Sequence, residues 1–219
     1  MAEKAGEPAS AARAVLKGAA VVREDPRRGG RARVGASSKA EVYQIGFVPM
    51  VDCAPVVVAQ EMGLFRKWSV RTRLSREVGW ASVRDRLLHQ EIHAAHASAT
   101  MAIALRCGLG SLAAPCVTSA VLAHQGSAVT LSTELALAIG SEPTRLRELV
   151  AGKSFGRRLR FAAVFQYSTQ HANLRRWLRD AGVDPERDVE VAMLPSPLVY
   201  RSMERGDIDG FCVAEPWGS

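Results

Sequence analysis

Hydrophobic and polar positions follow two rhythms along most of the chain. Residues 42–48 form a short apolar run typical of a strand, and residues 69–75 alternate as a half-exposed strand does. Residues 55–65, between them, have the spacing of a helix, with Asp52 near its start and Gly63 near its end. Further helices are predicted at 80–90, 101–107, 144–151, 168–180 and 198–204, and strands at 92–97, 159–164, 189–194 and 208–213.

This alternation of strands and helices predicts an α/β fold with parallel sheets covered by helices. Residues 117–122 and 128–131 are apolar and β-branched, and they predict central strands where one lobe passes to the next. We expect a first lobe over residues 41–130 and a second over 131–219. Residues 1–40 lack apolar periodicity, and they are predicted to be a disordered basic tail.

The charge distribution argues against a nucleic-acid-binding domain. The formal net charge is +7, but residues 1–40 hold nine Lys or Arg and four Asp or Glu, a net charge of +5. Residues 41–219 therefore carry only +2, so the folded part is nearly neutral and most of the basicity lies in residues 1–40. We expect no direct contact with nucleic acid.

The cysteines and the N-terminus predict a cytoplasmic protein. Four cysteines are widely spaced without a C-x-x-C pair, which favours reduced, buried thiols. No secretory signal is recognisable, and no run approaches the roughly 18 apolar residues of a membrane helix. If the start codon is assigned wrongly, a hidden signal would make the protein periplasmic instead.

Three histidines, His89, His93 and His96, lie close together near Glu91. Two ligands on one helix face need i,i+4 spacing, but these residues lie where a loop enters a strand. The pattern therefore predicts no metal site, and His96 is expected to be a hydrogen-bonded residue at a pocket floor. No G-x-S-x-G nucleophile motif occurs either, so we expect no catalytic residues, no cofactor and no enzyme activity.

Trp80 follows Gly79 at the start of a predicted helix. Its indole N–H would lie beside the free backbone donors of the first turn, which suit a small anion. The alternative is that Trp80 only fills the core. Arg84 and Asp85 are expected to hold the same helix in place.

Four segments together resemble the nitrate/bicarbonate-binding proteins of ABC transporters. They are residues 45–59, residues 79–87 (GWASVRDRL), residues 94–98 and residues 209–217 (DGFCVAEPW). The resemblance covers residues 42–219. It implies a type II periplasmic-binding-protein-like fold with two α/β lobes, and a binding function without catalysis.

The resemblance also implies ligand-binding residues. Trp80 matches a tryptophan that contacts the ligand, and Gln125 and Ser127 lie in a segment similar to the family's cleft segment. The helix beginning at Ser168 matches one that normally starts Thr-His-Asn, so Gln170 takes the position of the histidine and His171 comes one residue later. Family members continue beyond Trp217 and return to the first lobe. We therefore expect a truncated chain with part of that lobe's apolar surface uncovered.

The resemblance is closest to a cytoplasmic branch that senses nitrate or nitrite. Its partners would be the small anion (nitrate, nitrite or bicarbonate) and an RNA-binding antiterminator protein, whereas an exported member would serve an ABC permease. Two competing interpretations stay open: an enzyme similar to the thiamine-pyrimidine-precursor synthases, and a degenerate remnant. The sequence does not choose between the anions or assign an oligomeric state.

Overall fold

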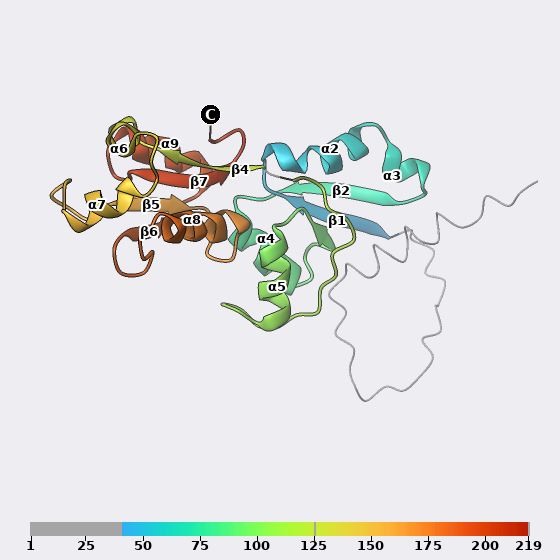
Figure 1. The fold of residues 1–219 in the computed structure, drawn as a ribbon. Coiled ribbons are helices and arrows are strands. Elements are labelled where there is room, and N and C mark those ends of the chain that lie inside the picture. Colours follow the sequence, from blue (N-terminus) through green and yellow to red (C-terminus); the bar gives the residue numbers. More distant parts are fainter. Residues whose placement is uncertain (1–40, 125, 219) are drawn as a thin grey trace, which may run out of the picture. The chain divides into compact units, whose positions relative to one another are not determined.

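The computed structural model describes residues 41–124 and 126–218, which divide into two compact units (Figure 1). Unit 1 comprises residues 41–49, 53–77 and 82–122. Unit 2 comprises residues 50–52 and 78–81 together with the described residues from Ala123 onward. Each unit has its own sheet with helices against it, so the predicted α/β class is confirmed. The tail prediction for residues 1–40 lies outside the described residues.

The sheet of unit 1 is parallel, with strand order β2-β1-β3. Helices α2 and α3 lie on one face of this sheet, and α4 and α5 lie on the other (Figure 1). This is the arrangement that right-handed crossovers between parallel strands produce. The elements up to residue 107 are β1 (Val42–Phe47), the 3-10 helix η1 (Val51–Cys53), α2 (Ala54–Glu61), α3 (Leu64–Lys67), β2 (Arg71–Arg76), α4 (Trp80–Leu88), β3 (Ala94–Ala95) and α5 (Ala99–Cys107).

Three expectations for unit 1 need correction. The single helix at 55–65 is wrong, because Gly63 adopts a left-handed φ of 66° and separates α2 from α3. The strand expected at 92–97 is only two residues long, Ala94–Ala95, and just before it both the His93 backbone N–H and the His93 Nδ1 bond the backbone of Gln44. Residues 117–122 form no strand, and β-branched residues become a strand only where another strand pairs with them.

The sheet of unit 2 has strand order β4-β7-β5-β6, with β4 antiparallel to β7 and the other pairs parallel. The expectation of a central strand in a parallel sheet at residues 128–131 is therefore wrong, because β4 lies at the edge of this sheet and runs antiparallel to β7. The elements of unit 2 beyond residue 126 are β4 (Ser127–Leu131), α6 (Thr133–Ile139), α7 (Arg145–Ala151), β5 (Arg160–Ala163), α8 (Thr169–Asp180), β6 (Glu190–Met193), α9 (Ser196–Glu204) and β7 (Gly210–Ala214).

Both faces of this sheet are buried, and alternate residues of its central strands serve opposite faces. Phe161 and Cys212 point into a core that α6, α7 and α8 cover, whereas Phe211 and Val213 point into a core under α9. All five residues of β7 are buried, as expected for a central strand of a covered sheet.

Helix α6 was not predicted from the sequence. Its start carries a local signal, because the Ser132 hydroxyl oxygen accepts the backbone N–H of Leu135 at 3.2 Å. Leu135 and Ile139, four residues apart, bury its inner face. Within the described residues, no helix combines the length and apolar character that a bilayer crossing needs.

Candidate functional site

The first turn of α8 gathers several buried polar side chains in unit 2. The helix follows β5 after a short loop, at the carboxyl end of a parallel strand, where open α/β sheets generally bind ligands. Ser168 caps the helix: its hydroxyl accepts the backbone N–H of His171 at 3.1 Å and donates to the Phe165 carbonyl at 2.7 Å. The other N–H groups of the first turn have no acceptor inside the helix. The site therefore offers donors and the positive end of the helix dipole.

His171 lies in this turn with its ring held in one orientation. Its Nδ1 is 2.7 Å from the carbonyl oxygen of Gln166, and a carbonyl only accepts, so the proton of the neutral ring is on Nδ1. Burial lowers the pKa of His171 below its ordinary value, and the positive charge of Arg175 adds to this. The Gln166 hydrogen bond and Glu186 act in the opposite direction, but burial outweighs them. Its Nε2 is therefore an acceptor near neutral pH.

This lowered pKa predicts that unit 2 loses stability as the pH falls below about 6.5, the ordinary pKa of histidine. Between that value and the lower folded pKa, unfolded chains bind a proton that the folded protein does not, so the free energy of unfolding falls with pH. We expect His171→Asn, which keeps a donor to the Gln166 carbonyl, to flatten this dependence. Urea unfolding of both proteins between pH 5 and 7.5 measures the difference. Parallel pH profiles would contradict the assignment.

Gln170 is the second polar residue in the turn, and only 4% of it is exposed. Its Oε1 is buried and forms no hydrogen bond with any other described residue. A buried amide without its full set of partners is costly in a folded protein, and a bound ligand or water is one way in which such a group is satisfied. Because the amide carries an acceptor oxygen and a donor nitrogen of nearly equal size, a half-turn of the group lets either atom face that ligand.

The structure brings three of the five predicted ligand residues into one sheet-and-helix layer. Ser127 begins β4 opposite Ala214 of β7, and α8, which carries Gln170 and His171, packs against both strands. Ser127 is only partly buried. Gln125 lies outside the described residues.

Trp80 begins α4 and belongs, with residues 78–81, to unit 2. Only 3% of it is exposed. This burial agrees both with a wall of a ligand site and with a core residue, so its role stays a prediction. Later in α4, Arg84 Nε lies 2.8 Å from Asp85 Oδ1, and the Arg84 guanidinium donates to the Gly110 carbonyl at 3.4 Å. That this pair holds the helix in place stays a prediction.

His93 and His96 form hydrogen bonds with strand β1. His93 accepts from Gln44, as described, and its ring lies edge-on to Tyr43 with centroids 5.6 Å apart. His96 is buried, and its backbone N–H donates to the Gly46 carbonyl at 2.9 Å. Across residues 41–124 and 126–218, no three side chains of the His, Cys, Asp or Glu type gather as a metal site would require.

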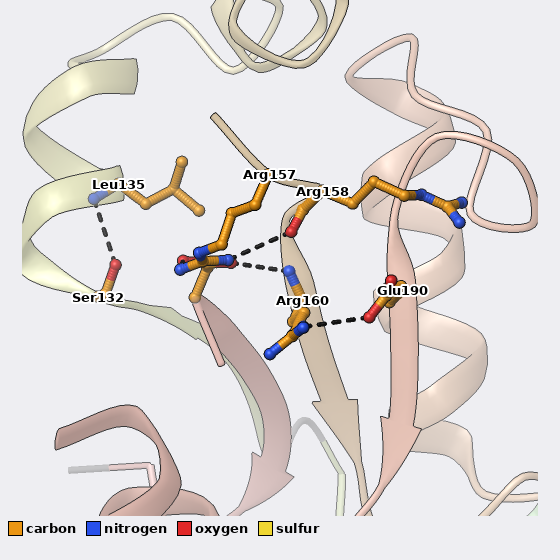
Figure 2. A network of polar contacts seen from close by, with 7 residues as sticks. Ser132, Leu135, Arg157, Arg158, Arg160 and Glu190 are labelled. Atoms are coloured by element: carbon orange, nitrogen blue, oxygen red, sulfur yellow. Dashed lines mark hydrogen bonds and ion pairs between the residues drawn. The ribbon is translucent and has the colours of Figure 1, made fainter. Parts of the chain in front are cut away.

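The sequence did not predict a polar network in the sheet of unit 2 (Figure 2). The network lies where β5 and β7 begin, at the end of the sheet opposite to the first turn of α8. Asp209 lies directly before β7 and is buried. Its carboxylate accepts hydrogen bonds from both terminal nitrogens of Arg157, each at 2.8 Å, and from the backbone N–H of Arg160 at 2.7 Å. The hydrogen bond to Asp209 raises the pKa of Arg157. The Asp209 backbone donates to the Arg160 carbonyl and accepts from Ser132. One residue thus joins β4, β5 and β7.

Further contacts in unit 2 involve the other residues of the segment 209–217. A Cβ added to Gly210 would lie 2.9 Å from the Thr130 carbonyl oxygen, so the close pairing of β4 and β7 requires glycine. Trp217 packs against the core under α9. The Glu215–Pro216 peptide bond, just before Trp217, is cis. The Glu215 carbonyl accepts the backbone N–H of Val51 at 2.9 Å.

Comparison with known proteins agrees with this fold. The sequence pattern of the NMT1-like family matches residues 35–219. The nitrate import ATP-binding protein NrtC of Synechocystis is 36% identical over 177 residues, which make up 80% of this chain and 26% of that protein. The nitrate/nitrite binding protein NrtA of Synechococcus elongatus is 31% identical over 195 residues, covering 84% of this chain and 44% of NrtA.

Among solved structures, the periplasmic nitrate-binding protein NrtA from Synechocystis superposes with a TM-score of 0.73 at 23% identity, over 82% of this chain and 48% of that one. The chain thus spans less than half the length of each of these relatives. The resemblance read from the motifs is confirmed, and so is the type II periplasmic-binding-protein-like fold. This chain belongs to the NMT1-like family, with the fold of the substrate-binding proteins of ABC transporters.

Proposed function

We propose that this chain binds a small oxyanion, nitrate or nitrite, at the first turn of α8. The observation that carries the proposal is the pairing of a capped helix N-terminus with the buried amide of Gln170, whose Oε1 has no hydrogen-bond partner among the described residues. A half-turn of this amide would put its donor nitrogen in the place of Oε1, where it could donate to an anion. Helix N-termini bind anions because their backbone N–H groups and dipole both favour negative charge. Relatives named as nitrate and nitrite binding proteins support this choice of ligand.

The chemistry of such a ligand sets what the site must provide. A small anion has little apolar area, so micromolar affinity, about −8 kcal/mol, has to come from several converging donors. The backbone N–H groups of α8 and the amide of Gln170 would supply them. Neutral His171 contributes no N–H from Nε2, so the site depends more heavily on Gln170. We propose Trp80, Gln125 and Ser127 as the remaining contacts.

The proposal is tested by titrating the purified protein with nitrate, nitrite and bicarbonate in a calorimeter. Gln170→Ala and Trp80→Ala are each expected to weaken binding by roughly 1–3 kcal/mol, the usual cost of losing a charge-assisted hydrogen bond. Trp80→Phe keeps the apolar wall and removes only the indole N–H. The control is Gln166→Ala, an exposed glutamine beside the same helix. Equal affinity in wild type and Gln170→Ala would refute the site, and tighter binding of bicarbonate would change the ligand.

The proposed activity is binding without chemical conversion, and names of relatives such as the bicarbonate-binding protein CmpA of Synechococcus elongatus support it. Recovering the anion unchanged after long incubation with the protein checks this. Release of a new product would favour the enzyme interpretation.

We further propose a cytoplasmic role in nitrate sensing, with an RNA-binding antiterminator protein as the partner. The supporting observation is the sequence resemblance to that branch. Fractionation of cells that produce the native protein tests the location. Recovery in the periplasm would favour an importer role, in which the partner is an ABC permease.

A further inference from the structure

The edge of unit 1 formed by β2 and the residues just before it carries an unusual concentration of positive charge. Residues 62–76 contain five cationic side chains and no carboxylate, in a chain whose residues 41–219 have a net charge of only +2. All five are exposed, and none forms an ion pair with another described residue. The five are Arg66, Lys67, Arg71, Arg73 and Arg76. Elsewhere in the same unit, Arg84 and Arg86 have carboxylate partners.

Large apolar side chains are interspersed with these charges. Met62 is 70% exposed and Trp68 is 41% exposed, and Leu64 is exposed to a similar degree as Trp68. Exposed single hydrophobics are common, but here a tryptophan and two other long apolar side chains are exposed within seven residues of the sequence. Tryptophan beside Lys and Arg is the composition that favours a water–lipid interface.

The fold holds these residues at one margin of the sheet. Strand β2 is an edge strand, and α3 packs against it. Two left-handed residues, Gly63 and Ser69, bracket α3, and the Val70 backbone donates to the Phe65 carbonyl at 2.9 Å, so Trp68 lies in a short, fixed turn.

The cations flank the edge from both faces of the sheet. The Thr72 hydroxyl bonds Gln60 of α2, so Thr72 points to the face that carries α2 and α3. Arg71 and Arg73 alternate with Thr72 and therefore point to the other face. Arg66, Lys67 and Trp68 lie on the first face with α3. A flat surface that approached β2 edge-on would meet both groups.

We propose that this edge, defined as Met62, Leu64, Arg66, Lys67, Trp68, Arg71 and Arg73, docks on an anionic lipid surface. Arginine and lysine pair with the lipid phosphates, while Trp68, Leu64 and Met62 enter the headgroup region. The aliphatic residues favour lipid over single-stranded RNA, which would need further aromatic side chains on which bases could stack. The docking surface lies wholly in unit 1 and shares no residue with the proposed anion site, so either can fail alone.

Co-sedimentation of the full 219-residue chain with lipid vesicles tests the proposal. The vesicles are phosphatidylcholine alone, or phosphatidylcholine with roughly one-third phosphatidylglycerol. We expect binding only to the second kind and loss of binding at high salt. The double variant Arg71→Glu with Arg73→Glu should reduce partitioning about tenfold or more. Trp68→Ala should reduce it several-fold.

Two matched variants in unit 2 are the controls. Arg201→Glu with Arg205→Glu changes the net charge equally at exposed positions around α9, and Tyr200→Ala removes another exposed aromatic side chain. Both should bind vesicles as the wild type does. Equal loss in the control pair, or no loss in the edge variants, would show that total charge or residues 1–40 bind the lipid, and would overturn the proposal. Binding of a single-stranded RNA oligonucleotide that requires the same arginines, without vesicle binding, would also overturn it.

Discussion

Replacing Arg157 with methionine is expected to lower the free energy of unfolding of unit 2 by about 3 kcal/mol. The substitution keeps an unbranched apolar stem but removes both guanidinium donors to Asp209. Asp209 is 5% exposed, so its carboxylate would remain buried with only the Arg160 backbone N–H as a described donor. An uncompensated buried charge costs far more than a lost surface pair. Since Asp209 joins three strands, the loss should reach the whole sheet.

Arg160→Met is the matched control for this experiment. Arg160 pairs with Glu190 at 3.1 Å, but both side chains are about half exposed, and exposed pairs contribute about 0–1 kcal/mol. Urea unfolding followed by tryptophan fluorescence compares the two variants, because Trp177 lies in the unit 2 core beside Phe161. Equal destabilisation by the two substitutions would mean that the Arg157–Asp209 pair has no special weight.

Leu174→Ala should cost unit 2 about 2–5 kcal/mol. Leu174 lies in the middle of α8, is fully buried, and packs with Leu178 and Phe161 in the larger core. Truncation removes three heavy atoms and leaves a cavity that a close-packed core fills only in part. Helix α8 also carries Gln170 and His171, so the substitution should loosen the candidate site as well as the fold.

The control is Leu137→Ala on α6, because the Leu137 side chain is 77% exposed. Its effect should stay within about 0.5 kcal/mol, as for other surface substitutions. The same urea titration measures both variants. If Leu174→Ala proved no more harmful than Leu137→Ala, α8 would not be anchored as described, and its first turn would be a poor candidate for a rigid binding site.

Elements with local signals could be predicted closely from the sequence. Helix α8 was expected from residue 168 to 180 and runs from Thr169 to Asp180, with Ser168 as its cap. Its cap residue and its apolar spacing are both local properties of the chain. The strands β5 and β6 also lie within one residue of the expected bounds, since short, mostly apolar segments between helices mark strands in an α/β sequence.

The errors arose where an element depends on a partner distant in sequence. Residues 117–122 have strand composition, yet a strand exists only when another strand pairs with it, and composition does not name that partner. The direction of β4 was mispredicted for the same reason, because β4 is antiparallel only with respect to β7, its partner in the sheet. By contrast, the break at Gly63 was readable in principle, since glycine commonly ends a helix in the left-handed conformation.

The candidate site shows the same division. The sequence by itself determined the α/β class, the family resemblance, and the candidacy of Gln170, His171, Ser127 and Trp80, because motifs and spacing are properties of the chain. Only the tertiary structure decided that the Gln166 carbonyl sets the proton of His171, that Gln170 is buried with an unmet acceptor, and that Asp209 joins three strands. Those facts depend on burial and on distances between residues far apart in sequence, which become defined only when the chain packs.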